Sequence, residues 1–434
     1  MKSPIPNNKP AESHSYTATV ALKRSIIIPV SLSDYQAVVD DFPKFRAMLE
    51  DVYASHPELF PPEFEDGFQS KDKRLSLKLQ ITLRRITVGF GEQVAHYQIV
   101  PGDVLAYMTG KTEDLEKPLW LRKYSVPYWV LAEIFGRDAN YYHRIECMLG
   151  RCSVVGALSS KPGIIPKHFV ADEKHAKHLG KKAYIAMAAG GGCVLAAELT
   201  PSCDADSLRE SYGVLRQEAE WADPDHRFES ANTDGFQATV LALQMAFGKR
   251  LVLMSCILHL IISIRDGAKK KFREHYEEVA DWFWWCYEAE TKRGFAQRWK
   301  SFMRRAQESS WDEKIKGKLE RANEKKLDSY KAYYDNEGSH RVSTALDQLM
   351  GMLDRRLFAM RHLHGHFETS RLLIRGWAQI QNFAPWNPRT RKLNGAACPA
   401  ERLNGFRYRE SWLENLRVST SMGGYRHVPQ IPVE

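Results

Sequence analysis

The sequence predicts a mixed α/β protein whose sheet-forming core is interrupted by a long helical insertion. Between residues 169 and 254, short apolar segments of strand type alternate with amphipathic helical stretches. Residues 265–338 instead carry charges of both signs and several tryptophans, with no strand pattern. The 434-residue chain is 44% hydrophobic and 26% charged, an ordinary globular composition that suffices for two or three domains.

A small mixed α+β segment, residues 18–115, precedes the core. A proline in the first turn predicts a helix over 43–53. Alternating residue types predict hairpin strands over 77–88 and 94–100, joined by a glycine-containing turn at 89–92. An accessory DNA-binding role is our hypothesis for this segment.

Residues 116–160 have the spacing of a helix-turn-helix. A first helix should begin at Pro127 and end at Gly136, and a second should follow directly. An ordinary pair of antiparallel helices is the alternative. We favour DNA binding because the pair precedes the core. The second helix would then carry four residues toward the major groove: Asn140, Tyr141, His143 and Arg144.

The core is predicted over residues 161–264 and 339–385. Its elements should follow the order strand, strand, strand, helix, strand, helix, strand, at 169–172, 184–189, 193–199, 204–220, 228–234, 236–247 and 251–254. The first strand ends at Asp172 and the fourth at Asp234. This order, with a carboxylate on each of those strands, is the ribonuclease-H-like arrangement, which holds two metal ions.

Paired carboxylates at strand ends suit phosphodiester chemistry. Two divalent ions roughly 3.5–4 Å apart can activate an attacking oxygen and stabilise a leaving one. Mg²⁺ prefers oxygen ligands and is often held by one or two carboxylates plus substrate phosphates. We therefore predict Asp172 and Asp234 as catalytic metal ligands, with Glu173 and His175 holding them in position. The alternative is that each aspartate only caps a helix or begins a turn.

A third carboxylate is expected after the helical insertion. The tryptophans of the insertion should be core residues, with stacking on an unpaired base as the alternative. The core resumes at Ser339, and Asp347 lies beside an apolar helical stripe. Asp347 is our candidate for the third metal ligand, and Asp354 and Glu368 are its rivals.

Cys256 and His259 form a Cys-x-x-His directly after the last predicted strand. That spacing is half a zinc site, but the sequence has no second pair at a convincing distance. We therefore expect both residues to play a local structural role beside the active site.

The charge pattern favours a polyanionic partner. The net charge is +9. The C-terminal segment, residues 386–434, is basic and interleaved with aromatic residues, so we expect it to contact phosphates or to strap the core. Lys174 near the site should also contact phosphate. The tail residues that we expect to bind DNA are Arg389, Arg391, Arg407 and Arg409.

The sequence also bears on location. Residues 1–17 are polar and proline-rich, which predicts a disordered tail and no signal peptide. The most apolar run, 251–264, is too short to span a membrane. Seven scattered cysteines are typical of reduced thiols. We expect a cytoplasmic, nucleoid-associated protein that is neither secreted nor membrane-bound.

From about Leu119 to Gln430 the chain resembles DDE-type transposases of bacterial insertion sequences. It is similar to their Mutator and hAT grouping, in which a Cys-x-x-His follows the second acid and a helical insertion precedes the third. The strings that carry the resemblance are ADEKH at 171–175, NTDGF at 232–236, CILH at 256–259, RGWAQIQNFAPWNP at 375–388 and CPAERLNGFRYRESWLENL at 398–416.

The resemblance implies a function and a cofactor. Asp172 would bridge two Mg²⁺ (or Mn²⁺) ions, and Asp234 and Asp347 would each hold one. The family normally has Glu at the third position, so Asp347 is a departure. The enzyme would nick double-stranded DNA at the transposon ends and join the 3′-hydroxyl to target DNA, as a dimer or larger homo-oligomer. Two alternatives remain: an inactive DNA-binding relative, and a nuclease or resolvase that cuts without joining.

Overall fold

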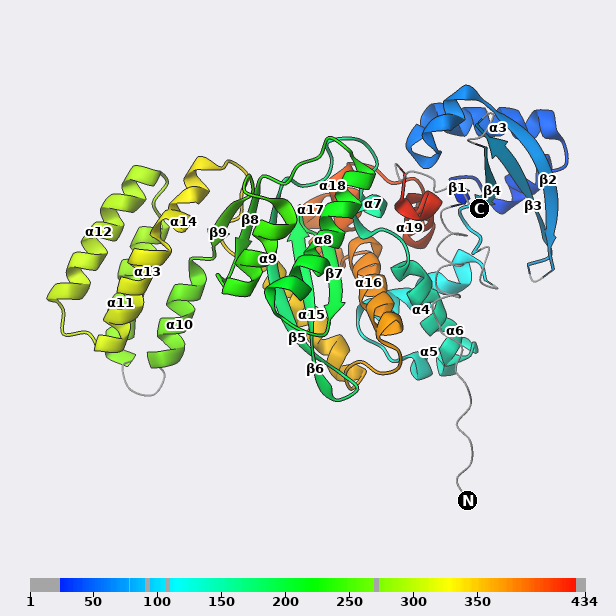
Figure 1. The fold of residues 1–434 in the computed structure, drawn as a ribbon. Helices are drawn as coiled ribbons and strands as arrows, with labels where there is room; N and C mark the ends of the chain where they lie inside the picture. The colour runs from blue at the N-terminus through cyan, green and yellow to red at the C-terminus, as the bar shows by residue number, and fades with distance from the viewer. Residues whose placement is uncertain (1–23, 78, 90–93, 106–109, 269–272, 427–434) are drawn as a thin grey trace, which may run out of the picture. The chain divides into compact units, whose positions relative to one another are not determined.

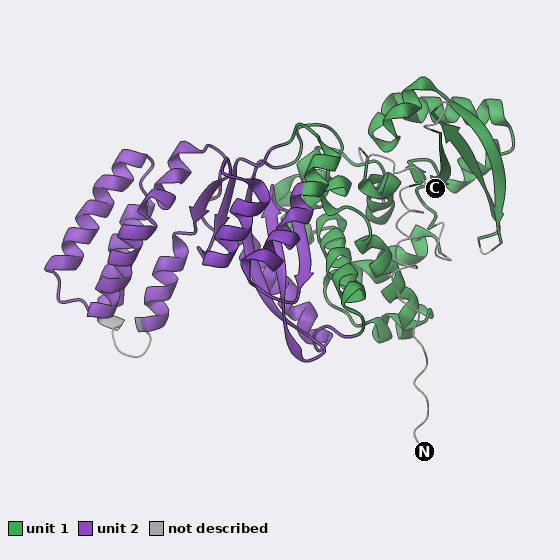
Figure 2. Ribbon diagram, in the orientation of Figure 1, with its two compact units in different colours: residues 1–165, 217–226, 365–434 green, residues 166–216, 227–364 purple. Residues whose placement is uncertain are grey.

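The chain forms a mixed α/β structure with two compact units, each with its own mixed sheet (Figure 2). The computed structural model describes residues 24–77, 79–89, 94–105, 110–268 and 273–426. Unit 1 comprises residues 1–165, 217–226 and 365–434, and unit 2 comprises residues 166–216 and 227–364. The predicted tail at 1–17 and most of the predicted hairpin turn at 89–92 lie outside the described residues.

The sheet of unit 1 has the order β1-β4-β3-β2, and two helices cover it. Its strands are β1 (Ser25–Ile28), β2 (Phe68–Ser76), β3 (Ile81–Val88) and β4 (Ala95–Pro101). β1 is parallel to β4, and the other pairs are antiparallel. Helices α2 (Leu32–Val38) and α3 (Phe42–Ser55) contribute Tyr35, Phe45 and Leu49 to the core. The predicted helix and both hairpin strands are confirmed, whereas β2 was not predicted.

The end of the described chain packs into this same core. Helix α19 (Trp412–Ser419) and the short helix η4 (Ser421–Gly424) bring Val418 and Met422 against the residues of β1. The Ser421 hydroxyl accepts a hydrogen bond from the Ile27 amide at 3.0 Å. It donates one to the Leu59 carbonyl at 2.6 Å. This part of the C-terminal segment is therefore a strap on the N-terminal core, and the basic helix α17 (Pro388–Asn394) precedes it.

Helices α6 (Ala139–Gly150) and α16 (Phe367–Phe383) meet through glycines. A Cβ at Gly150 would lie 1.9 Å from the Leu372 carbonyl oxygen, and one at Gly376 would lie 2.3 Å from the Glu146 carbonyl oxygen. Only glycine allows this close backbone approach. The sequence predicted 367–383 as part of the catalytic core, whereas α16 packs against several helices of unit 1 and belongs to that unit.

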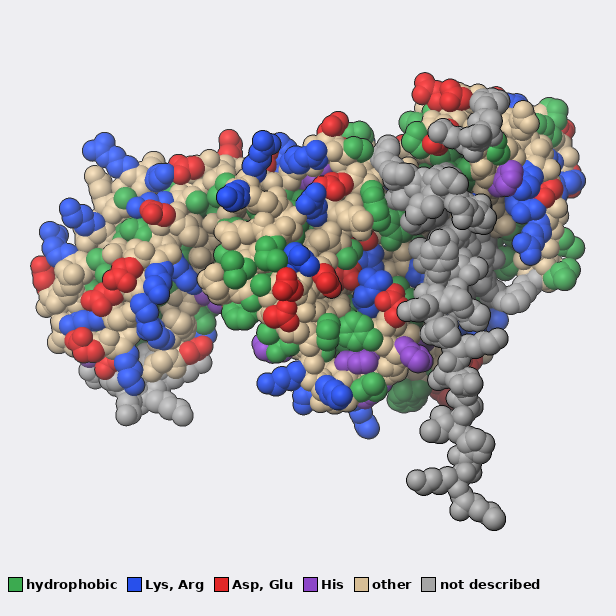
Figure 3. Space-filling view, in the orientation of Figure 1, with side chains coloured by type: hydrophobic (Ala, Val, Ile, Leu, Met, Phe, Trp, Pro, Cys, Tyr) green, Lys and Arg blue, Asp and Glu red, His purple; other side chains and the backbone are tan. Residues whose placement is uncertain are grey.

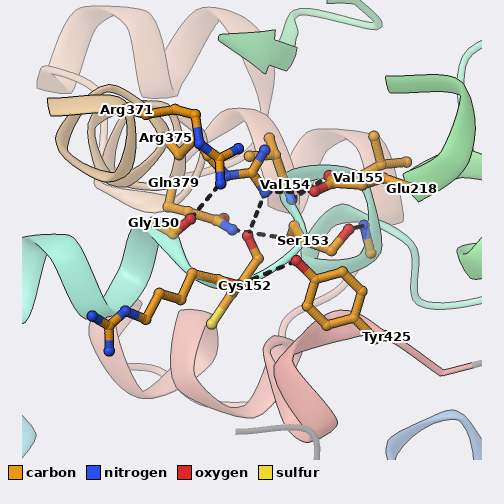
Figure 4. A network of polar contacts seen from close by, with 12 residues as sticks. Gly150, Cys152, Ser153, Val154, Val155, Glu218, Arg371, Arg375, Gln379 and Tyr425 are labelled. Atoms are coloured by element: carbon orange, nitrogen blue, oxygen red, sulfur yellow. Dashed lines mark hydrogen bonds and ion pairs between the residues drawn. The ribbon is translucent and has the colours of Figure 1, made fainter. Parts of the chain in front are cut away.

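A buried ion pair ties α16 to the last turns of α8 (Ala205–Ala222), whose residues from 217 on belong to unit 1 (Figure 4). Arg375 pairs with Glu218, and both side chains are 4% exposed. The guanidinium also donates to the carbonyls of Gly150 and Cys152, at 2.8 and 2.9 Å. Glu218 in turn accepts a hydrogen bond at 2.7 Å from the amide of Val154, the first residue of α7 (Val154–Leu158). Each charge is thus satisfied inside the protein, as burial requires.

The sheet of unit 2 has the order β7-β6-β5-β8-β9 (Figure 1). Its strands are β5 (His168–His178), β6 (Lys181–Gly190), β7 (Cys193–Thr200), β8 (Ser230–Thr233) and β9 (Val252–Ser255). β5, β8 and β9 are parallel, whereas β6 runs antiparallel to both of its neighbours. Gly191 and Gly192 join β6 to β7 and both have positive φ, 58° and 81°, as the commonest two-residue hairpin turn requires.

Helices lie on both faces of this sheet. On β5, Glu173 faces α8 and α9 (Gln237–Phe247), because its carboxylate accepts hydrogen bonds from Tyr212 and Thr239. Lys174 points to the opposite face. There it pairs with Asp354 of α15 (Thr344–Ala359) at 2.6 Å. The predicted alternation of strands and helices from 169 to 254 is confirmed.

The insertion is a set of helices with its own core. It consists of α10 (Leu258–Ala268), α11 (Arg273–Tyr287), α12 (Lys292–Glu308), α13 (Glu313–Lys325), α14 (Leu327–Lys331) and η3 (Ala332–Asp335). Trp299 and Trp311 are buried in that core, as predicted, whereas Trp284 and Trp285 are exposed. Figure 3 shows both signs of charge on its visible surface. Among the described residues, no helix has the length and apolar character to cross a bilayer.

Candidate active site

Asp172 and Asp234 stand at equivalent positions of two neighbouring parallel strands. The last register pair of β5 and β8 is Val170 with Asn232, and each aspartate lies two residues further on. β8 ends at Thr233, but β5 continues to His178 along β6. The prediction that the first strand ends at Asp172 was therefore wrong. Asp172 lies in mid-strand, where its parallel neighbour stops.

Backbone amides hold one oxygen of each carboxylate. The Glu173 amide donates to Asp172 Oδ1 at 2.7 Å, and the Phe236 amide donates to Asp234 Oδ1 at 2.6 Å. Gly235, which lies between Asp234 and Phe236, has φ +85°, a conformation that favours glycine. The loop after β8 therefore turns sharply and fixes the Asp234 side chain at the carboxyl end of the strand.

The two aspartates repel each other electrostatically. Burial, and after it the charge of Asp234, raises the pKa of Asp172 to about 7. A cation bound between two such carboxylates neutralises their charges and so stabilises the ionised form of both. The geometry and charge of the pair thus fit a divalent metal ion.

The side chains of Glu173 and His175, which were predicted to hold the aspartates in position, have partners of their own. The Glu173 carboxylate accepts hydrogen bonds from the hydroxyls of Tyr212 and Thr239, both at 2.6 Å, on the helix-covered face of the sheet. Burial raises the pKa of Glu173, and these two hydrogen bonds oppose that shift. His175 is exposed and lies against the ring of its cross-strand partner Tyr184 at 5.0 Å. Glu173 therefore ties β5 to α8 and α9, and His175 packs on the hairpin.

Cys256 and His259 lie beside the carboxylates and form a local pair. The Cys256 amide donates to the Thr233 carbonyl at 2.6 Å, which extends the pairing of β8 and β9. Burial raises the pKa of Cys256, but hydrogen bonds from His259 and Ser343 outweigh it and bring the pKa below its usual value. The hydrogen bond with Cys256 raises the pKa of His259, and the charges of Asp234 and Asp172 add to the rise.

Asp347 is connected to this pair. The Ser343 hydroxyl lies 3.4 Å from Cys256 Sγ and 3.2 Å from Asp347 Oδ2. Ser343 directly precedes α15, and Asp347 lies in its first turn. The rival carboxylates have other partners. Asp354 pairs at 2.6 Å with Lys174, the residue that was predicted to contact phosphate. Glu368 belongs to unit 1 and makes two 2.8 Å contacts with Arg371.

The predicted DNA-binding residues differ in accessibility. In α6, Asn140 and Arg144 are exposed and His143 is half-buried, but Tyr141 is only 8% exposed. Tyr141, which was predicted to face the major groove, is thus buried like most residues of α6. On α17, Arg389 and Arg391 are exposed. Arg407 pairs with Glu410, and Arg409 pairs with Glu414 at 2.8 Å.

Three contacts of the site were not predicted: those of Tyr212 and Thr239 with Glu173, and that of Lys326 with the Asp234 backbone. Lys326 Nζ donates to the Asp234 carbonyl at 3.0 Å from 92 residues away in the sequence. A polar tyrosine within the apolar stripe of α8 is the one signal that could have indicated Tyr212. Nothing in the local sequence distinguishes Lys326 from the other lysines of the insertion.

The donor set suits magnesium better than zinc. Within the described part of the chain, no three His, Cys, Asp or Glu side chains are grouped closely enough to hold a metal ion. The two carboxylates of Asp172 and Asp234 nevertheless supply the hard oxygen ligands of a Mg²⁺ site that substrate phosphates complete. Asp172 and Asp234 would hold the ions, with Asp347 as the candidate third ligand.

Searches of protein-family models and of curated proteins find no match to this chain.

Proposed function

We propose that this protein is a DDE-type transposase with a ribonuclease-H-like catalytic core. The observation that carries the proposal is the placement of Asp172 and Asp234 two residues beyond the same register pair of adjacent parallel strands. The strand order β7-β6-β5-β8-β9, with β6 as the antiparallel member, supports the ribonuclease-H-like assignment. The position of Cys256 and His259 directly after β9 also supports it.

The proposed reaction is metal-dependent phosphoryl transfer on double-stranded DNA. When bound, two Mg²⁺ or Mn²⁺ ions supply activation of the attacking oxygen and stabilisation of the leaving one. Asp172, Asp234 and Asp347 would hold these ions. Water first attacks the phosphodiester at the transposon end and releases a 3′-hydroxyl. That hydroxyl then attacks a target phosphodiester in line and displaces the 3′-oxygen of the target strand, which leaves as a hydroxyl. Two DNA ends must be held together, so a homodimer or larger assembly is part of the proposal.

The surrounding contacts keep the carboxylates in place for this chemistry. Glu173 anchors β5 through Tyr212 and Thr239, so the strand cannot slide relative to α8 and α9. Backbone amides orient Asp172 and Asp234. Preorganised ligands of this kind lose no free energy to rearrangement when the substrate binds.

A joining assay tests the proposal. Labelled DNA from both flanks of the coding sequence is incubated with target plasmid, Mg²⁺ and either the wild type, Asp234→Ala or Asp354→Asn. The wild type and Asp354→Asn should give joined product, and Asp234→Ala should give none. Cutting without joining would identify a nuclease or resolvase instead, and binding without metal-dependent cutting would identify an inactive DNA-binding relative.

A further inference from the structure

Lys326 brings a positive charge from the helical insertion to the candidate site. It lies between α13 and α14, and its ammonium donates to the main-chain carbonyl of Asp234 at 3.0 Å. α14 packs against β9 in the same unit (Figure 1). The insertion is therefore more than a separate helical body, because one of its side chains reaches the residue that carries the second carboxylate.

The backbone at Lys326 is firmly held. The Lys326 amide donates to the Ala322 carbonyl, and its carbonyl accepts from Tyr330, both at 2.9 Å. Tyr330 is buried in the core of the insertion, with its ring 6.0 Å from that of Trp299. Ser329 Oγ accepts a hydrogen bond at 2.6 Å from the amide of Ser255, the last residue of β9. α14 is thus fixed to the sheet edge, and the lysine side chain starts from a fixed point.

The loop after Asp234 leaves room for the ammonium. A Cβ at Gly235 would lie 2.6 Å from Lys326 Nζ and 3.2 Å from Cε. Gly235 has φ +85°, which any other residue would adopt only with strain. The absence of a side chain at 235 therefore brings the ammonium against the backbone beside the carboxylate pair.

A main-chain carbonyl is a modest partner for a lysine ammonium. A phosphate oxygen carries negative charge, so it attracts an ammonium more strongly than a neutral carbonyl oxygen does. Lysine is a common phosphate ligand because its flexible stem lets the charge move by a few ångströms. With DNA at the carboxylate pair, a phosphate oxygen would be a better acceptor for Lys326 than the Asp234 carbonyl.

We propose that Lys326 is a phosphate-contacting residue of the site, supplied by the helical insertion. The inference rests on the proposed function, since it takes a DNA phosphodiester as the substrate at Asp172 and Asp234. Without DNA, the ammonium holds the Asp234 carbonyl. With DNA, it binds a non-bridging oxygen of the phosphate next to the one that is cut, and no bond to Lys326 forms or breaks.

The test compares Lys326→Met, Lys326→Gln and Lys326→Arg with the neighbouring exposed Lys325→Met as control. Steady-state cleavage over a range of DNA concentrations separates KM from kcat. Removing the charge should raise KM on the order of tenfold, and should reduce the slope of log affinity against log salt by about 0.9. Lys326→Arg should retain most of the affinity, and Lys325→Met should match the wild type.

The outcomes separate this inference from the proposed function. Lys326→Gln retains a donor for the Asp234 carbonyl, so a wild-type salt slope in a folded Lys326→Gln variant would overturn the phosphate contact. Thermal unfolding shows which variants are folded. If the wild type binds DNA but never cuts it, the proposed function fails, and the salt slope still decides the role of Lys326. Equal KM and equal slopes for Lys326→Met and Lys325→Met would also overturn it.

Discussion

Asp172 and Asp234 continue one parallel register: each lies two residues beyond the Val170–Asn232 pair of β5 and β8. The strands thereby bring together two carboxylates that are 62 positions apart in the sequence. Because burial and the charge of Asp234 raise the pKa of Asp172 to about 7, the pair is costly to ionise without a cation.

Asp172→Asn should make the metal-free protein more stable at alkaline pH. The pKa of Asp172 is raised in the folded state relative to about 3.9 in an unfolded chain. Its contribution to stability is therefore fully present below about pH 4 and is lost as the pH rises toward 7. At pH 8 the free energy of unfolding of the variant should exceed that of the wild type by roughly 1–2 kcal/mol, after allowance for solvent screening.

Urea unfolding in EDTA at pH 4 and pH 8 measures this difference. Asp354→Asn is the control. Asp354 is an exposed partner of Lys174, so its loss should change the free energy of unfolding by less than about 1 kcal/mol at either pH. An Asp172→Asn variant that is no more stable than the wild type at pH 8 would contradict the raised pKa.

Asp347 should be the third acid of the proposed reaction. Asp347→Asn should reduce metal-dependent cleavage by at least about 10²-fold, the scale of losing one stabilising group in an active site. Glu368→Gln should leave cleavage near the wild-type rate, because Glu368 pairs with Arg371. Initial cleavage rates on the same labelled DNA decide between them, and the reverse ranking would move the third ligand to Glu368.

Breaking the buried Arg375–Glu218 pair should strongly destabilise unit 1. Arg375→Met leaves a buried carboxylate without its cation and should cost about 3–5 kcal/mol. The double variant Arg375→Met/Glu218→Met should cost less than the sum of the single variants, because no charge is then left unpaired. Arg371→Met, which removes a half-exposed pair, should cost less than about 1 kcal/mol in the same denaturant measurement.

Gly376→Ala should also destabilise unit 1. Its Cβ would lie 2.3 Å from the Glu146 carbonyl oxygen, so α6 and α16 would have to separate, at a cost of about 1–3 kcal/mol or more. Gly351→Ala is a matched control, since it is also helical but has open space at its Cβ. That change should stabilise by about 0.5–1 kcal/mol. Thermal unfolding of both variants shows whether Gly376→Ala lowers the Tm and Gly351→Ala raises it.

The sequence predicts the elements of unit 2 well because their residue patterns are local. The apolar strands β6, β7 and β9 and the amphipathic helix α8 each carry their own signal. β2 was missed because it is an edge strand whose residues are mostly polar and exposed. The length of β5 was also missed, because its second half is polar and is held as a strand by pairing with β6.

Contacts between distant segments could not be predicted from residue types. α16 was assigned to the core because it follows α15 in the sequence, but glycine packing against α6 places it in unit 1. Likewise, the Lys326 contact depends on how α14 packs against β9, which no local pattern encodes. The carboxylate pair was predictable because Asp172 and Asp234 follow segments of two neighbouring parallel strands, even though β5 itself continues beyond Asp172.

Calorimetric titration of Mg²⁺ or Mn²⁺ into the wild type, Asp172→Asn and Asp234→Asn, at pH 5.5 and pH 8, tests the central claim most directly. Metal binding requires ionised carboxylates, so the wild type should bind more tightly at pH 8. At pH 5.5, where Asp172 with its pKa of about 7 is protonated, binding should release protons. Both variants should lose most of the affinity, whereas Asp354→Asn should keep it. Binding that is unchanged in Asp172→Asn and Asp234→Asn would show that the pair is not the metal site.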